Sequence, residues 1–456
     1  MDIYSTFSSY NIFMTIYALS SGIGVSGVAI VRISGPDTKN VITLLTSGRF
    51  PKPRVATLKK VNNINKTDVI DEGIILWYPA PKSYTGEDMA EIQVHGSRAV
   101  VNSLLKSISQ IKNCRLAEPG EFTKIALKNG KIDLLKAESI GDLIASETEI
   151  QMKQALKIIA GNNLKQFEDW KKDLIKILSN IEAKIDFPEE NLPENILKNI
   201  RRDTKKIIFE MEKNLKDKRV GEIIREGFRI AIIGPPNVGK SSLLNYLSNR
   251  DAAIVSSSAG TTRDVIETHL NIDGYPVIIS DTAGIREAKD EIERKGIRLS
   301  LKKAEEADLN IVIVELKSKQ NQRFLDKHMN KKAILVINKI DKRASRIPTN
   351  LKKLNPILIS IKNEMNVNKL INMIKRKIKN QFKGSENILI TRERHRNNLI
   401  ECLDNLKNFE RKRDQGDFDK AAEDIRLATR SLGKITGKVD VEVILDSIFN
   451  DFCIGK

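Results

Sequence analysis

The stretch Gly234-Pro-Pro-Asn-Val-Gly-Lys-Ser241 decides the fold of the middle of this 456-residue chain. The apolar run at 228–233 predicts a short buried strand before it, and residues 242–247 continue as a helix. A strand, a glycine-rich loop with a lysine, and a helix are together typical of a P-loop, whose backbone N–H groups and helix N-terminus hold phosphate. In such a loop Lys240 contacts the β- and γ-phosphates, and the Ser241 hydroxyl ligates Mg²⁺.

A second pattern identifies the base. Residues 333–337 predict a buried strand that ends in Asn338-Lys-Ile-Asp341. In this NKxD pattern the aspartate accepts hydrogen bonds from the N1–H and the exocyclic amine of guanine. Adenine lacks that pair of donors, so the aspartate selects guanine. Ser360-Ile-Lys362 follows another predicted strand and is similar to the SAK-type loop with which GTPases contact the base.

Hydrolysis depends on two further loops. Asp281-Thr-Ala-Gly284 follows the predicted strand at 277–279, which places Asp281 for the Mg²⁺ shell and the Gly284 N–H for the γ-phosphate. Ile285 comes next, where Ras-type enzymes have the glutamine that orients the attacking water. We therefore predict that Glu293, in the acidic stretch 287–293, orients the water, although a lone glutamate is usually part of a solvated helix face. Asn237 and the switch loop 256–264 offer oxygens for a monovalent cation that would neutralise charge in the transition state.

The flanking sequence predicts a multidomain fold. Residues 14–125 read as an α+β domain with strands at 26–34, 71–78 and 91–95. Apolar residues then recur at helical spacing from 131 to 187, with Gly161-Asn-Asn163 between two helices, and again at 194–218, 392–413 and 418–432. An α/β pattern interrupts this helical part. We predict an N-terminal α+β domain (14–125), a helical-bundle domain in two parts (126–220 and 379–456, ending in FCIGK), and an inserted α/β, Ras-like P-loop G domain (221–378).

Composition indicates which kind of partner and which cellular compartment the protein suits. The formal net charge of +18 favours a polyanionic partner such as nucleic acid, although the basic residues are spread along the chain. The three cysteines and four histidines show no zinc-ligand spacing. The small and odd number of cysteines is typical of a protein in a reducing cytosol. No apolar run reaches the roughly 18 residues of a membrane span. The N-terminus lacks the basic region of a signal peptide, and residues 1–13 read as an extension before the first strand.

Taken together, these patterns resemble the MnmE (TrmE) family of GTPases that modify the tRNA wobble uridine. The G domain alone would also fit ribosome-assembly GTPases of the Era and EngA type, so the flanks decide between them. The similarity runs from about residue 15 to the C-terminus. It is carried by RISG (32–35), YTGED (84–88), EIQVHG (91–96), EPGEF (118–122), NGKIDL (129–134), IDFPE (185–189), TRERHR (391–396) and FCIGK (452–456).

The resemblance implies a cytoplasmic homodimer that forms a heterotetramer with the FAD-dependent protein MnmG (GidA). The pair would install an aminomethyl-type group, such as carboxymethylaminomethyl, at C5 of uridine 34 in certain tRNAs. It implies a tetrahydrofolate one-carbon donor, either the 5-formyl or the 5,10-methylene derivative, and potassium-stimulated dimerisation of the G domains. Two alternatives stay open: a ribosome-assembly GTPase that binds rRNA without modifying it, and a regulatory switch whose partner does all the chemistry.

The resemblance also implies roles for single residues. Folate would contact Arg32, Glu91, Lys131 and Lys456, each of which would otherwise read as an ordinary surface charge. Lys240 and Glu293 would serve hydrolysis, and Cys453 would be either a nucleophile toward C6 of uracil or a positioning residue. Mg²⁺ would take Ser241 and Thr262, and K⁺ would take Asn237, Ser256, Ser258 and Thr261. The predicted GTP contacts are Asn237, Val238, Gly239, Lys240, Ser241, Ser242, Ser256, Ser257, Ser258, Ala259, Gly260, Thr261, Thr262, Asp281, Thr282, Ala283, Gly284, Asn338, Lys339, Asp341, Ser360, Ile361 and Lys362.

Overall fold

The computed structural model describes residues 14–186, 195–250, 267–281, 302–316, 321–342, 347–383, 388–414, 418–438, 448, 452, 453 and 455. The chain divides into two compact units. One unit comprises residues 1–141 and 432–456, and the other comprises residues 142–431. The domain boundaries given above are not tested by this division and stay predictions.

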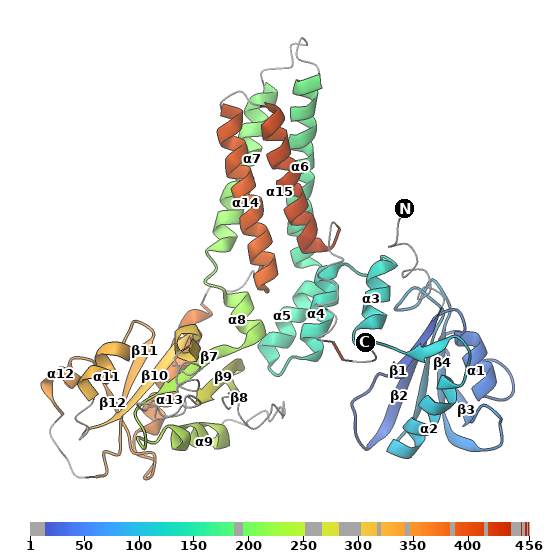
Figure 1. Ribbon diagram of the computed structural model, residues 1–456, viewed down its shortest axis with the longest axis horizontal. Helices are drawn as coiled ribbons and strands as arrows, with labels where there is room; N and C mark the ends of the chain where they lie inside the picture. Colours follow the sequence, from blue (N-terminus) through green and yellow to red (C-terminus); the bar gives the residue numbers. More distant parts are fainter. Residues whose placement is uncertain are drawn as a thin grey trace, which may run out of the picture. The chain divides into compact units, whose positions relative to one another are not determined.

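The first unit is built on a six-stranded sheet with the strand order β3-β4-β5-β2-β1-β6 (Figure 1). Neighbouring strands run antiparallel except β1 and β6, which pair in parallel. The predicted strands at 26–34, 71–78 and 91–95 are confirmed as β2, β4 and β5. The elements of this unit are β1 (Thr15–Leu19), β2 (Ser26–Ser34), α1 (Thr38–Leu45), β3 (Thr57–Asn62), β4 (Val69–Tyr78), β5 (Met89–Gly96), α2 (Arg98–Ser109), β6 (Cys114–Leu116), α3 (Glu121–Lys128) and α4 (Leu134–Ile144), whose end reaches into the second unit.

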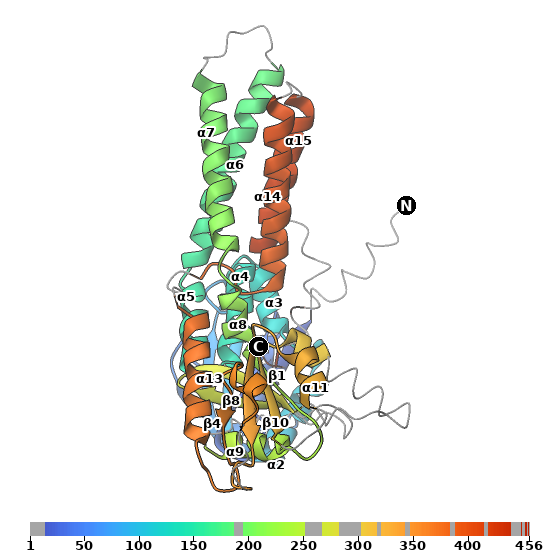
Figure 2. The same cartoon turned by 90° about the vertical axis from the view of Figure 1, so that its left-hand side faces the viewer.

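Four long helices of the second unit run side by side (Figures 1 and 2). They are α6 (Asn162–Asp186), α7 (Asn195–Leu215), α14 (Glu393–Asp414) and α15 (Phe418–Thr436), of which the last few residues belong to the first unit. Their buried side chains recur every three or four residues, as in Phe167, Trp170, Leu174, Ile177 and Ile181 of α6. This spacing lines one face of a helix, and burial of that face is what stabilises a bundle. The predicted break before α6 is confirmed, since α5 (Glu149–Ile159) ends just before Gly161.

A second six-stranded sheet forms the α/β part, with the strand order β12-β11-β10-β7-β9-β8. All described pairs are parallel except β8 with β9. Parallel strands covered on both faces read as continuous apolar runs, which explains sequences such as LNIVIVE in β10. The elements are α8 (Val220–Glu226), β7 (Phe228–Ile233), α9 (Lys240–Arg250), β8 (Glu267–Ile272), β9 (Tyr275–Asp281), β10 (Leu309–Glu315), α11 (Asn321–His328), β11 (Ala333–Asn338), α12 (Thr349–Lys352), β12 (Ile357–Leu358) and α13 (Val367–Gln381).

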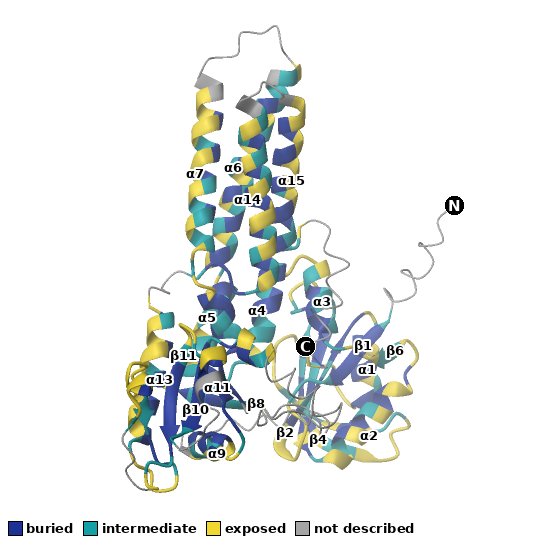
Figure 3. Cartoon of the chain, turned by 60° about the vertical axis from the view of Figure 1, so that its left-hand side comes forward, coloured by how far each residue is buried: buried dark blue, intermediate teal, exposed yellow. Residues whose placement is uncertain are grey.

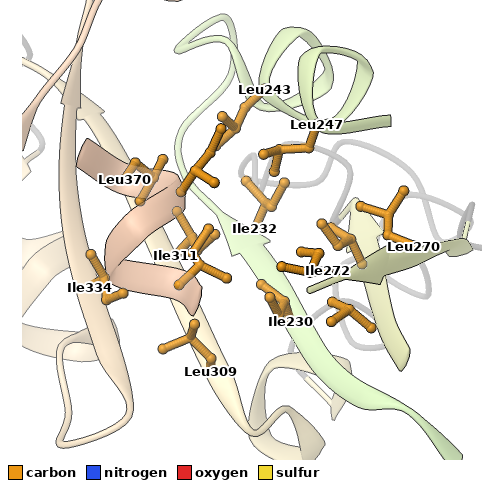
Figure 4. Packing of buried hydrophobic residues seen from close by; sticks show 14 of the residues in the cluster. Ile230, Ile232, Leu243, Leu247, Leu270, Ile272, Leu309, Ile311, Ile334 and Leu370 are labelled. Carbon is orange, nitrogen blue, oxygen red and sulfur yellow. The ribbon is translucent and has the colours of Figure 1, made fainter. Parts of the chain in front are cut away.

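Helices from both ends of this α/β part pack on the sheet. Figure 4 shows Ile230 and Ile232 of β7 between Leu243 and Leu247 of α9 and Leu270 and Ile272 of β8. Leu370 of α13 closes the same cluster beside Ile311 of β10. Figure 3 shows buried residues on the strands and on one face of each long helix. Among the described helices, none is both long and apolar enough to cross a membrane.

Candidate functional site

The glycine-rich loop lies where the sequence predicts it, between the end of β7 at Ile233 and the start of α9 at Lys240. Gly239 has φ +100, and a Cβ atom there would lie 2.4 Å from Nδ2 of Asn338. A Cβ atom on Gly234 would lie 2.3 Å from the carbonyl oxygen of Ile313 in β10. Glycine is therefore needed at both positions for the loop to pack against β10 and β11.

Lys240 is buried inside this loop, with 7% of its surface exposed. Its Nζ donates hydrogen bonds to the carbonyl oxygens of Gly234 and Pro235, each at 3.1 Å. The ammonium group is therefore held at the loop that would surround a phosphate. Ser241 and Ser242 follow in the first turn of α9, where the helix N-terminus and its dipole also favour an anion.

Asn338 connects two loops that lie far apart in the sequence. Its Nδ2 donates to the carbonyl oxygen of Val238 at 2.7 Å, and its Oδ1 accepts from the N–H of Ile361 at 3.3 Å. The side chain is buried, so these bonds are shielded from water. One amide therefore fixes the phosphate loop relative to the base-contacting loop. The next residue, Lys339, donates from Nζ to the carbonyl oxygen of Asn237 at 2.5 Å.

Asp341 is held by Ser360, whose hydroxyl donates to its Oδ1 at 2.5 Å. This hydrogen bond is the main cause that lowers the pKa of the Asp341 carboxyl group below its usual value, with a smaller contribution from the nearby Lys362. The carboxylate is exposed and ionised at neutral pH, which suits an acceptor for two guanine donors. The structure thus brings residues 237–242, 338–341 and 360–362 to one edge of the sheet. These loops follow the carboxyl ends of the parallel strands β7, β11 and β12.

Part of the predicted nucleotide site lies outside the described residues. This holds for the metal- and GTP-contacting residues Ser256, Ser257, Ser258, Ala259, Gly260, Thr261 and Thr262, for Thr282, Ala283 and Gly284, and for Glu293. The backbone of Asp281 ends β9 beside Ile232 of β7, which is next to the phosphate loop. The roles of Asp281 and of the residues outside the described part stay predictions.

In the first unit, Arg32 of β2 and Glu91 of β5 lie opposite each other in the antiparallel pair. Nη2 and Nε of Arg32 donate to Oε1 of Glu91 at 2.8 and 3.2 Å, and each side chain is 14% exposed. The guanidinium carbon lies 5.7 Å from the ring centre of Tyr84 and 5.8 Å from that of Phe122. Tyr84 and Phe122 belong to the YTGED and EPGEF motifs, but no local pattern in the sequence indicated that their rings lie beside Arg32.

Near the C-terminus, Gly455 contacts Arg32 of β2 and the end of β1. Nη1 of Arg32 donates to the carbonyl oxygen of Gly455 at 3.4 Å, and the Ser20 hydroxyl donates to it at 2.7 Å. Gly455 has φ +97, and a Cβ atom there would lie 2.3 Å from the carbonyl oxygen of Leu19. Cys453 is exposed, and its carbonyl oxygen accepts from the N–H of Gly120 at 3.4 Å. The tail therefore meets the Arg32–Glu91 pair, whereas Lys456 lies outside the described residues.

Lys131 lies at the loop that contains Tyr84. Its Nζ donates to the carbonyl oxygen of Pro81 at 2.6 Å, and its side-chain carbons lie 3.3 Å from where a Cβ atom of Gly86 would be. Asn129, two residues earlier, donates from Nδ2 to the carbonyl oxygen of Thr85 at 2.7 Å. The predicted residues Arg32 and Lys131 therefore both contact the 81–86 loop, and Glu91 is paired with one of them.

Two family models match the chain. One is described as GTP-binding protein TrmE N-terminus and matches residues 15–131, and the other is described as MnmE helical domain and matches residues 134–453. A curated tRNA modification GTPase MnmE from Pelagibacter ubique is 62% identical over 443 residues, which cover 97% of this chain and 100% of that protein. The chain belongs to the MnmE family of tRNA modification GTPases.

This MnmE-family chain is therefore a GTP hydrolase that acts in tRNA modification. Proteins of the same name from Rickettsia bellii and Parvibaculum lavamentivorans are 43% and 42% identical over 447 and 445 residues, in each case 97% of this chain and 100% of the relative. A solved structure of Era from Aquifex aeolicus bound to GDP.AlF4- is 30% identical and covers 33% of this chain and 56% of its own, with a TM-score of 0.28. The full-length matches favour the tRNA modification family over the ribosome-assembly alternative.

Proposed function

We propose that this MnmE-family GTPase couples GTP hydrolysis to the installation of an aminomethyl-type group at C5 of uridine 34 in certain tRNAs. The FAD-dependent protein MnmG would be its partner, and carboxymethylaminomethyl is one such group. The observation that carries this proposal is the C-terminal tail, with its exposed Cys453, folded against the Arg32–Glu91 pair. A chain that only switched a partner would have no evident use for an exposed thiol two residues before the glycine that Arg32 contacts. A tRNA substrate and three free cysteines fit a cytoplasmic location.

A tetrahydrofolate derivative, 5-formyl or 5,10-methylene, fits the chemistry of these residues. A carboxylate such as Glu91 can accept hydrogen bonds from the N–H groups of a pterin. Arg32, Lys131 and Lys456 can hold the glutamate carboxylates of folate, and the rings of Tyr84 and Phe122 offer apolar surface. The bound folate would supply the one-carbon unit, while these side chains bind and orient it.

Homodimerisation through the first unit is part of the proposal. Six described apolar side chains of its sheet and turns are more than half exposed: Ile23, Val25, Val28, Leu58, Val69 and Leu116. Ile23, Val25 and Val28 are close together in the chain, and an exposed apolar patch is typical of a surface that binds another protein. We propose that two copies associate through this unit and that the dimer joins two MnmG chains in a heterotetramer.

Hydrolysis would depend on two metal ions. We propose Mg²⁺ at Ser241 and Thr262, and K⁺ at Asn237, Ser256, Ser258 and Thr261, where a monovalent cation would neutralise transition-state charge as the G domains dimerise. Asn237 is exposed at the phosphate loop, which leaves its amide oxygen accessible to a cation. The rate of GTP hydrolysis should then fall strongly when sodium replaces potassium. Equal rates in both salts would contradict the proposed potassium site.

Glu293→Ala should abolish GTP hydrolysis but keep the affinity for GTP.

Analysis of tRNA nucleosides tests the proposal as a whole. Cells that lack this protein should lose the C5-substituted wobble uridine from their tRNA, as measured by mass spectrometry, and the intact gene should restore it. Arg32→Ala should fail to restore it, whereas Arg115→Ala, which also removes an ion pair from the same unit, should succeed. Unchanged nucleosides in the deletion strain would exclude the proposed reaction. Cys453→Ser separates a thiol nucleophile, which it would remove, from a positioning role.

A further inference from the structure

The outward face of α7 carries basic side chains around an exposed phenylalanine. Lys198, Arg202, Lys205, Phe209 and Lys213 follow one another at spacings of four, three, four and four residues, so they lie on one face of the helix. We call these five residues the α7 stripe. Its cations extend over about 22 Å at about 1.5 Å per residue. The opposite face is buried in the bundle through Ile200, Thr204, Ile207 and Met211.

The acidic residues of α7 pair with only one of the four stripe cations, Arg202. The helix contains six Lys or Arg residues and three Asp or Glu residues. Asp203 pairs with Arg202, Glu210 accepts from Trp170 of α6 at 2.7 Å, and Glu212 pairs with Lys407 of α14 at 2.7 Å. Within the described part of the chain, Lys198, Lys205 and Lys213 make no ion pair. The stripe therefore presents free positive charge to solvent.

Phe209 distinguishes the stripe from an ordinary solvated helix face. Its side chain is 68% exposed, although a large apolar group in water gains nothing for the stability of the fold. A sequence of lysines around an accessible aromatic ring matches the surfaces that bind RNA, where cations contact phosphates and the ring stacks on a base. Protein interfaces, by contrast, are depleted in lysine, which argues against a protein partner on this face.

We infer that the α7 stripe is a docking surface for tRNA, with Lys198, Arg202, Lys205 and Lys213 on phosphates and Phe209 stacked on an unpaired base. The inference rests on the proposed function, because it concerns the tRNA that the enzyme modifies. The stripe positions the RNA and takes no part in GTP hydrolysis or in the chemistry at uridine 34. It lies wholly in the second unit, away in sequence from the residues of the folate and guanine sites.

Binding of an unmodified tRNA transcript with uridine at position 34 to the full-length protein tests the stripe. The triple variant Lys198→Gln, Lys205→Gln, Lys213→Gln should bind this tRNA roughly 10- to 100-fold more weakly at 0.15 M salt, and its plot of log affinity against log salt should be shallower by about 2. Phe209→Ala should bind about tenfold more weakly with an unchanged salt slope, since one stacked base is lost.

The matched control removes the same charge from another helix. Lys369, Arg376 and Lys383 are exposed, make no ion pair within the described residues, and belong to α13 or follow it directly. Their triple Gln variant should keep tRNA affinity within about twofold, and all variants should hydrolyse GTP at the rate of the unchanged protein. Equal weakening by both triple variants, or no weakening by the α7 variants, would overturn the inference. If the α7 variants lost MnmG binding but kept tRNA binding, the α7 stripe would be a protein-binding surface and the inference would be wrong. Failure of the unchanged protein to bind tRNA would instead remove the proposed function together with the stripe.

Discussion

At the scale of single residues, the guanine site divides its tasks between two side chains of one motif. Asn338 is buried and fixes two loops through hydrogen bonds to Val238 and Ile361. Asp341 is exposed and is oriented by Ser360, which leaves its remaining oxygen lone pairs for a ligand. Asn338, which fixes the two loops, and Asp341, which is placed to bind guanine, thus lie three positions apart in sequence.

Replacement of Asp341 by asparagine should change the preferred base. The amide would present a donor where guanine also has its amine donor, so GTP affinity should fall about 100-fold or more through loss of two charge-assisted hydrogen bonds. Xanthosine triphosphate carries a carbonyl at that position and should bind better than GTP. Titration of both nucleotides measures the ratio. Ser360→Ala is the control, because it should weaken binding about tenfold with guanine still preferred. Continued preference of Asp341→Asn for GTP would contradict the role of Asp341.

A half-buried glutamate in the first unit, Glu87, predicts a pH dependence of stability. Burial raises the pKa of Glu87, and the nearby Glu121 adds to this effect, while a hydrogen bond from Ser34 at 2.9 Å opposes it. A raised native pKa means that the native state binds the proton more tightly than the unfolded state. Stability is therefore lost as the pH rises from the unfolded pKa, about 4.3, through the raised native value. Glu87→Gln should remove this loss, so its thermal melting temperature should gain on the unchanged protein between pH 4 and 7. Parallel curves for both proteins would be inconsistent with this assignment.

At the scale of elements, the short helix α8 fixes both ends of the α/β part. Arg396 of α14 donates from Nε to Glu222 at 2.6 Å and from Nη2 to Asp217 at 2.7 Å. Glu222 is 1% exposed, so Arg396 takes the place of water as the hydrogen-bond donor to its carboxylate. Gly221 lies so close to Ile390 that a Cβ atom would be 2.0 Å from the carbonyl oxygen. The chain that enters the α/β part before β7 and the chain that leaves it after α13 are therefore held together at α8.

Arg396→Met should destabilise the second unit strongly, because it leaves the buried Glu222 carboxylate without its main partner. The expected cost is about 3–5 kcal/mol of unfolding free energy. The double variant Arg396→Met, Glu222→Gln should recover a large part of this loss, since no buried charge remains. Arg426→Met is the control: Arg426 is 49% exposed and pairs with Glu182 and Glu423, so its loss should change the free energy of unfolding far less than the loss of Arg396. Urea unfolding of the three variants gives these differences, and equal costs for Arg396 and Arg426 would refute the buried-pair account.

At the scale of the whole molecule, the two ends of the chain form one unit. Residues 432–456 belong with residues 1–141, so the segment between them is an insertion in this unit. Phe452 packs against Gly141, whose Cβ atom would lie 2.9 Å from the phenylalanine ring. Gly455 then contacts Leu19 and Ser20 near the end of β1. The tail is thus part of the folded structure at both of these positions.

Gly455→Ala should displace the tail and weaken binding of 5-formyl-tetrahydrofolate about tenfold or more, because the new Cβ atom overlaps the Leu19 carbonyl oxygen. Calorimetric titration of the folate derivative measures this loss, and GTP turnover should be unchanged. Gly48→Ala is a matched control, since Gly48 also has positive φ in the same unit but its nearest neighbour is the flexible end of Lys59 at 3.7 Å. Equal folate affinity of the two variants would separate the tail from the proposed folate site.

Local sequence determined the parts of this protein in which interacting residues are close together in the chain. The phosphate loop joins a strand to a helix within about twenty residues, and the NKxD motif ends its own strand, so both could be predicted without a fold. Helical spacing likewise predicted α6, α7, α14 and α15, whereas the single helix expected before Gly161 is divided into α4 and α5. The interpretation of Arg32, Glu91 and Lys131 came only from family resemblance, because an isolated charged residue carries no local signal.

Only the tertiary structure decided which distant residues meet. The strand order β12-β11-β10-β7-β9-β8, the antiparallel pairing of β8, and the contact of Gly455 with Arg32 join residues that can be more than 400 positions apart. Such contacts depend on the simultaneous burial of many side chains rather than on any short pattern. The physical reason is range: dihedral preferences and periodicity act over a few residues, whereas packing selects among many arrangements of the same elements.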